Sequence, residues 1–131
     1  RIQLILQQLN KISPYEKKRI NQVKQRIVKD IDELIGKGEI NKNRFEEELI
    51  YYIEKMDITE EKLRLKKHCD YFLETMKQPE ANGRKLGFIS QEIGREINTL
   101  GSKANDADIQ KLVVQMKDEL EKIKEQLLNI L

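Results

Sequence analysis

The carboxyl-terminal end of the sequence carries the pattern that most restricts what the chain can fold into. Apolar residues there recur at alternating spacings of four and three, at Ile109, Val113, Met116, Leu120, Ile123, Leu127 and Ile130. This spacing is the a/d seam of a helix that packs along the length of another helix. We therefore expect a long final helix whose partner lies elsewhere in the chain or in another subunit.

Helical periodicity also runs through the rest of the chain. Apolar residues fall on one side of the helices expected within residues 2–9, 20–34, 65–76 and 86–100. Charged residues make up 37% of the sequence and aromatic residues 5%, a composition typical of solvent-exposed helices rather than of sheets. The sequence predicts an all-α fold of about five to six long amphipathic helices, arranged in antiparallel hairpins or as an elongated bundle.

Short motifs predict where these helices begin and end. Ser13-Pro14-Tyr15-Glu16 combines a cap residue, a proline and a glutamate in the order of a helix start, so we expect a new helix there. A similar start is present at Asp57-Ile58-Thr59-Glu60. Gly36-Lys37-Gly38, Pro79 and Gly101 are typical of helix ends or weak points.

The chain is expected to form one continuous domain, with amino-terminal helices over residues 1–43 and a second helical region over residues 44–131. The helical pattern begins at the first residues, and no capping residue precedes Arg1. We therefore expect the chain to be a piece of a longer protein.

Composition narrows the classes of function. The 25 basic and 23 acidic residues nearly cancel, so net charge by itself indicates neither a nucleic-acid nor a membrane partner. The sequence has no signal peptide, no long apolar run and no glycine-rich phosphate loop. Its single cysteine, Cys69, lies on an apolar stripe and is interpreted as a core residue. We expect a soluble cytoplasmic protein without a membrane partner or a nucleotide cofactor.

Two polar bands carry the residues that could do chemistry. The first lies on the helix expected over residues 83–103 and contains Arg84, Lys85, Glu92, Arg95, Glu96, Thr99 and Lys103. Its two carboxylates, one turn apart, could share a divalent cation while the basic residues hold phosphate. The alternative is a solvated helix face with internal pairs between glutamate and arginine.

The second band lies one helix earlier and contains Asp57, Glu61, Arg64, His68 and Tyr71. An imidazole beside carboxylates could bind a metal or act as a general acid or base near neutral pH. A lone helical histidine is more often structural, and that alternative stays open. For Asp57 we favour a helix-capping role.

Several ordered blocks of sequence resemble a known family. They are Arg44-Phe45-Glu46-Glu47-Glu48-Leu49, Asp57-Ile58-Thr59-Glu60-Glu61, Arg64-Leu65-Lys66-Lys67-His68, Gly83-Arg84-Lys85-Leu86, and the segment from Gln91 to Lys103. With these blocks, the chain resembles the carboxyl-terminal helical region of the YicC-like endoribonuclease family. Gly94 departs from the family pattern, which has asparagine at this point.

The resemblance implies a bacterial cytoplasmic enzyme that cuts RNA internally with a divalent metal, manganese or magnesium, as a ring-like homo-oligomer with an additional amino-terminal domain. Taken with the two polar bands, it predicts catalytic and metal-binding roles for Glu61, His68, Glu92 and Glu96. It predicts RNA-binding roles for Arg64, Arg84, Lys85, Arg95 and Lys103. The alternatives are a noncatalytic adaptor that binds RNA or protein, and a helical oligomerisation module.

Overall fold

The computed structural model describes residues 1–36, 42–78, 82–104 and 106–130. These residues form five helices: α1 (Ile2–Gly36), α2 (Lys42–Met56), α3 (Thr59–Met76), α4 (Gly83–Lys103) and α5 (Ala107–Ile130). The described residues contain no strand, so the predicted all-α fold is confirmed.

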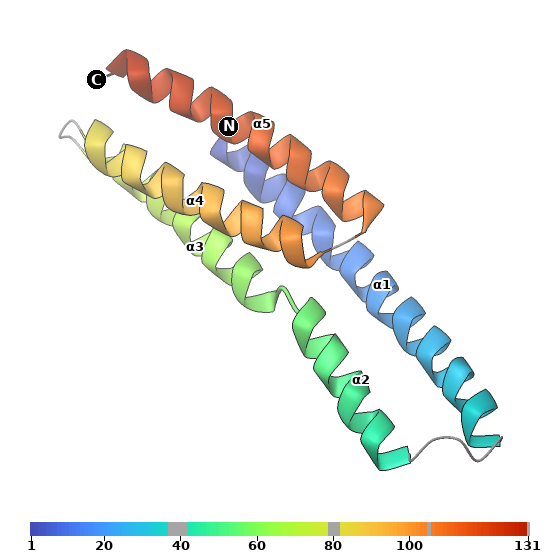
Figure 1. The fold of residues 1–131 in the computed structure, drawn as a ribbon. Helices are drawn as coiled ribbons and strands as arrows, with labels where there is room; N and C mark the ends of the chain where they lie inside the picture. The colour runs from blue at the N-terminus through green and yellow to red at the C-terminus, as the bar shows by residue number, and fades with distance from the viewer. Residues whose placement is uncertain (37–41, 79–81, 105, 131) are drawn as a thin grey trace.

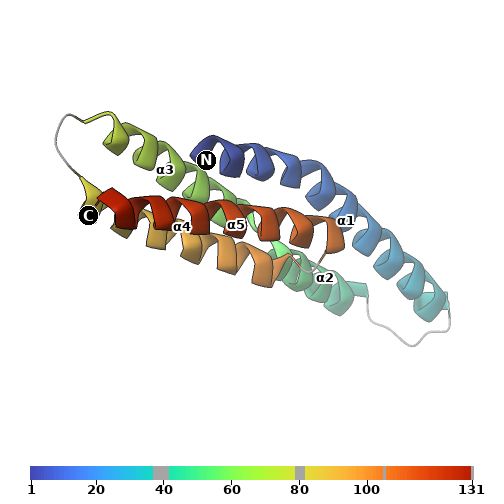
Figure 2. The ribbon, with the colours of Figure 1, turned by 90° about the horizontal axis from the view of Figure 1, so that it is seen from above.

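Four helices pack around a shared core, and the fifth extends away from it. The amino-terminal half of α1 lies against α5, α5 against α4, α4 against α3, and α3 against α1. Each of these neighbours runs antiparallel to the next, as Figure 1 and the view from above in Figure 2 show. The distal half of α1 and the whole of α2 form a hairpin that projects from one end of the bundle (Figure 1). No described helix is long and apolar enough to span a bilayer.

The partner that the carboxyl-terminal seam requires lies within the chain. The seam residues Ile109, Val113, Met116, Leu120, Ile123 and Leu127 are all buried, and α5 packs on both α1 and α4. The side chain of Ile130, the last position of the seam, lies outside the described residues. The predicted long final helix is therefore confirmed, with its apolar stripe forming one side of the core.

The helix start predicted at Ser13-Pro14 is wrong, because α1 continues through Pro14. The residues on either side of the proline are held by contacts outside their own helix. The hydroxyl of Ser13 accepts a hydrogen bond from Lys62 of α3 at 3.3 Å, and the carboxylate of Glu16 pairs with the same ammonium group. Ile12, one turn before Glu16, is fully buried in the core. These tertiary contacts outweigh the local preference for a break.

Helix α4 approaches α5 closely at two glycines. A Cβ atom at Gly94 would lie 3.2 Å from Cδ2 of Leu120, and one at Gly101 would lie 3.1 Å from Cγ1 of Val113. Gly101 is not a helix end, because α4 continues past it to Lys103. Because Gly94 faces α5, a side chain at this position would point toward that helix.

Asp57 positions the start of α3. Its carboxylate accepts hydrogen bonds from the backbone N–H of Thr59 at 2.9 Å and from the Thr59 hydroxyl at 2.5 Å. These bonds lower the pKa of Asp57. Asp57 thus satisfies a donor at the start of the helix, in agreement with the capping role, although the helix itself begins after Ile58.

Candidate nucleic-acid interface

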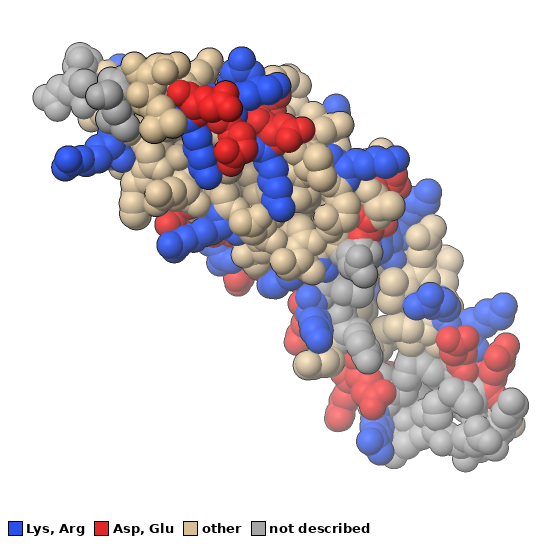
Figure 3. Space-filling model, turned by 45° about the horizontal axis from the view of Figure 1, so that its top comes forward, with Lys and Arg blue, Asp and Glu red and all other residues tan. Residues whose placement is uncertain are grey.

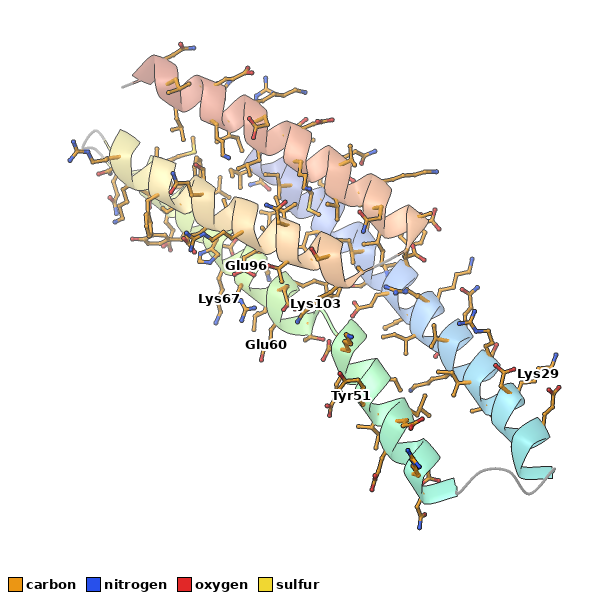
Figure 4. All side chains as sticks on the ribbon, in the orientation of Figure 1. Lys29, Tyr51, Glu60, Lys67, Glu96 and Lys103 are labelled. Carbon is orange, nitrogen blue, oxygen red and sulfur yellow. The ribbon has the colours of Figure 1, made fainter. Side chains whose placement is uncertain are left out.

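The two predicted polar bands meet where α3 packs against α4. Lys103 Nζ lies 2.7 Å from Oε1 of Glu61, and Arg64 Nε lies 3.1 Å from Oε1 of Glu96. We call these four residues the charged cluster. Figure 4 places Glu96 and Lys103 at the edge of α4 that borders α3. Antiparallel packing of the two helices brings together side chains that are more than 30 residues apart in the sequence.

Glu61 is the buried member of the charged cluster, with a side chain that is 3% exposed. Its Oε1 atom accepts from both Lys103 and Arg64, the latter at 3.5 Å, whereas its Oε2 atom is buried with no hydrogen-bond partner in the described chain. Burial acts to raise the pKa of this carboxyl group. The hydrogen bond from Lys103 and the charges of Lys103 and Arg64 outweigh that effect, and the pKa lies below its ordinary value. Glu61 is therefore a buried carboxylate that stays ionised.

Arg64 is the most connected member of the charged cluster. Besides Glu96 and Glu61, its guanidinium reaches the carboxylate of Glu60 at 3.3 Å. The bond to Glu96 is the largest cause of a raised pKa for this arginine. Its side chain is nevertheless 47% exposed, and that of Glu60 is 81% exposed. One end of the guanidinium is thus anchored to buried or half-buried carboxylates, and the other faces solvent.

The remaining predicted site residues lie outside the charged cluster. Glu92 pairs with Arg95 of its own helix at 3.5 Å. His68 is half-buried and makes no hydrogen bond or ion pair with any residue that the structure describes. Arg84 is exposed at the beginning of α4, and Lys85 lies over the ring of Tyr71, 5.0 Å from its centroid. The structure therefore brings four of the nine predicted residues into the charged cluster and pairs two others, Glu92 and Arg95, outside it.

The four expected metal ligands do not form a ligand set within one chain. Among the described residues, no three His, Cys, Asp or Glu side chains lie close enough together to hold a metal ion. Glu61 and Glu96 are already engaged by Lys103 and Arg64. The metal-binding assignments of Glu61, His68, Glu92 and Glu96 stay predictions.

Sequence reasoning missed two features of this region. Glu60 belongs to the helix-start motif at Asp57, and its carboxylate is also the exposed partner of Arg64. The spacing of four residues between Glu60 and Arg64 is the signal that could have indicated this pair. The link from Lys62 to Glu16 joins α3 to α1 on its other side, and no local pattern marks it.

The distribution of charge outside the α3–α4 contact bears on whether a polyanion would be attracted to the molecule. On the face shown in Figure 3, acidic and basic side chains are interspersed rather than separated into one large basic area. Within α5, charged side chains also pair with one another, such as Lys122 with Glu119 at 3.3 Å and Lys124 with Glu121 at 3.6 Å. A polyanion would therefore find no broad attractive field on this face.

The fold and this geometry define an all-α bundle that carries a partly buried ionic cluster between two antiparallel helices. The family described as the carboxyl-terminal region of YicC-like endoribonucleases matches residues 12–131. The chain belongs to this family, so the resemblance noted in the sequence is confirmed.

Two relatives illustrate the similarity. The chain is 37% identical over 131 residues to a protein of Clostridioides difficile named "Probable endoribonuclease YicC", an alignment that covers 99% of this chain and 45% of the relative. It is 38% identical over 91 residues to a protein of the same name from Haemophilus influenzae, covering 70% of this chain and 32% of that relative. The chain thus spans less than half the length of these relatives.

Proposed function

We propose that the protein to which this chain belongs cleaves RNA internally, and that the charged cluster between α3 and α4 contacts the RNA backbone. Membership in the YicC-like endoribonuclease family supports the activity. The proposed position of the RNA backbone rests on the pairing of Glu61 with Lys103 and of Glu96 with Arg64. These pairs place two cations along the contact between α3 and α4.

The contacts of Arg64 explain how a phosphate could bind there. Glu96 holds Nε and buried Glu61 lies near Nη2, so the position of the guanidinium is fixed from within the protein. Glu60, the partner of Nη1, is 81% exposed. An RNA phosphate can replace this exposed carboxylate at little cost, because the exposed pair is weak and guanidinium groups bind phosphate through two parallel hydrogen bonds.

Lys103 offers a second contact of the same kind. Its ammonium group is anchored by Glu61, yet the side chain is 40% exposed. An ammonium group carries three donors, and a single carboxylate oxygen uses one of them. The remaining donors are available to a second phosphate. The carboxylates in this proposal orient the cations, and the cations bind the substrate.

Arg64→Met in the full-length protein tests this location. RNA affinity should fall, and the slope of log affinity against log salt should become shallower by roughly 0.7 for the loss of one contact to single-stranded RNA. Arg44→Met is the matched control, because Arg44 is 82% exposed and pairs only with Glu48 of its own helix, at 3.8 Å, among the described residues. Equal affinity and salt slopes for the two variants would refute a role of Arg64 in RNA binding.

The same assay separates the alternatives. A noncatalytic adaptor would bind RNA with a steep salt dependence and cleave it under no divalent metal, whereas an oligomerisation module would neither bind nor cleave. We also propose that the full-length protein is a ring-like homo-oligomer and that it is cytoplasmic. Light scattering of the full-length protein tests the first of them.

Divalent metal dependence, on manganese or magnesium, is a further proposal. It predicts that RNA cleavage by the full-length protein is lost after chelation and returns with added metal. Glu92→Gln then tests one assigned ligand, because this change removes a negative charge while leaving the basic residues intact. Cleavage should fall while RNA binding persists. A wild-type rate across a manganese titration would exclude Glu92 as a ligand.

A further inference from the structure

An aromatic ring lies beside the charged cluster, on the same side of α3. Tyr71 is 43% exposed, and Nζ of Lys85 in α4 lies 5.0 Å from its ring centroid. Tyr71 follows Arg64 by seven residues, which corresponds to two turns or about 10 Å along the helix axis. The contact between Tyr71 and Lys85 is therefore a further polar link between α3 and α4, in addition to Glu61 with Lys103 and Arg64 with Glu96.

The environment of the ring differs from that of a core aromatic residue. Phe72, the next residue in α3, is 4% exposed and contributes to the core. The Tyr71 hydroxyl makes no hydrogen bond with any described residue. The cation over the ring is thus the polar contact that orients it, and part of its surface stays open to solvent.

We infer that Tyr71 and Lys85 form a stacking subsite for one unpaired base of the RNA, next to the phosphate contacts of Arg64 and Lys103. Open aromatic surface binds a nucleobase by stacking. Lys85 supports the ring through a cation–π contact and offers its charge to the neighbouring phosphate. This inference rests on the proposed function and narrows its substrate to RNA that is single-stranded at this point.

The spacing of the contacts agrees with a short stretch of one strand. Along one strand of a stacked duplex the charges are about 3.4 Å apart, and an unstacked strand spaces them more widely. The axial distance of about 10 Å between Arg64 and Tyr71 therefore corresponds to at most about three nucleotides. A duplex cannot use this subsite, because both faces of each internal base are already covered by its neighbours.

The test compares the binding of two RNA probes to variants of the full-length protein. The probes are a fluorescently labelled oligouridylate, whose bases stack little on one another in solution, and a duplex RNA of the same length. Tyr71→Phe keeps the ring, whereas Tyr71→Leu removes it and keeps an apolar side chain. Tyr51→Leu is the matched control, because Tyr51 is 61% exposed and lies on α2 (Figure 4).

Tyr71→Leu should weaken binding of the single strand by roughly 5- to 150-fold, the factor that corresponds to a stacking contribution of about 1–3 kcal/mol. Tyr71→Phe and Tyr51→Leu should bind like the wild type, and binding of the duplex should not change with Tyr71→Leu. Two results would overturn the inference: unchanged single-strand affinity in Tyr71→Leu, or an equal loss with the duplex. A wild-type protein that cleaves RNA under the same conditions shows that such a failure concerns the subsite alone, whereas a wild type that neither binds nor cleaves RNA refutes the proposed function itself.

Discussion

Replacing Lys103 with methionine tests whether the buried carboxylate of Glu61 depends on its cation. The change removes the ammonium group and keeps a side chain of similar shape. In the folded chain, Lys103 Nζ lies 2.7 Å from Glu61 Oε1, and Glu61 is 3% exposed. The variant would leave this carboxylate with the contact to Arg64, which is longer at 3.5 Å. We therefore expect Lys103→Met to destabilise the fold.

The expected loss of folding stability depends on the burial of Glu61 and on the partial exposure of Lys103. A hydrogen bond to a charged group contributes about 1.5–3 kcal/mol to stability. Lys103 is itself 40% exposed, and solvent screening places its contribution toward the lower end of that range. We expect the free energy of unfolding at neutral pH to fall by about 1–2 kcal/mol, and the melting temperature to fall by roughly 3–8 °C for a chain of this size.

The loss should also depend on pH. The pKa of Glu61 in the folded chain is lower than its ordinary value. Its charge therefore stabilises the fold above the pKa of the unfolded chain, and this contribution disappears as the pH falls through the folded-state pKa. A protonated Glu61 is neutral and is not stabilised by the charge of Lys103. The free energies of unfolding of the wild type and of Lys103→Met should therefore converge in acid.

Urea unfolding followed by circular dichroism, repeated from neutral pH into acid, measures both effects. Lys111→Met is the control, because Lys111 is exposed on α5 and forms no ion pair within the described part of the chain. The reasoning is wrong if Lys103→Met costs no more than Lys111→Met at neutral pH. It is also wrong if the difference between the wild type and Lys103→Met stays constant as the pH falls.

Three further predictions concern the core. Leu65→Ala should cost about 2–5 kcal/mol in urea unfolding, because Leu65 is fully buried, whereas Leu63→Ala, at a position 53% exposed, should change stability by less than about 0.5 kcal/mol. Burial, with a smaller effect of the charge of Asp70, raises the pKa of Cys69 to about 12, so a thiol reagent should label it slowly in the folded chain at mildly alkaline pH and rapidly in urea. Leu120→Asp should abolish cooperative thermal unfolding, because it puts a charge at a site that is 3% exposed; an unchanged melting temperature would contradict this.

Much of the fold could be predicted from sequence because its helices depend on periodic burial. The apolar stripe from Ile109 to Leu127 alternates spacings of four and three without interruption, and every described residue of that stripe is buried. The helix start predicted at Pro14 was wrong because it depended on local sequence and not on periodic burial. It rested on a motif of four residues, and contacts made by Lys62 from another helix decided the outcome.

The candidate site was predictable in its composition and not in its pairing. The helical repeat places Glu92 and Glu96 in the same polar band, but of these two carboxylates it is Glu96 that pairs with Arg64, whereas Glu92 pairs with Arg95 within α4. The choice between them depends on how far α4 is displaced along α3. That register follows from the packing of both helices on the core, and the repeat of a single helix does not determine it.

Packing on the two sides of α4 limits how the site can respond to RNA. Toward α5, the missing side chains of Gly94 and Gly101 allow an approach in which even one added carbon would lie within 3.2 Å of Leu120 or Val113. A contact this close leaves little room for α4 to slide or rotate, because interiors are tightly packed. Toward α3, the groups that can move are the exposed ends of side chains, above all Glu60, which is 81% exposed. We therefore expect RNA to displace Glu60 from Arg64 and to leave the helices in place. Apart from the side chain of Glu60, the groups that would contact phosphate and base are therefore already in place in the free protein, an arrangement that lowers the entropic cost of binding.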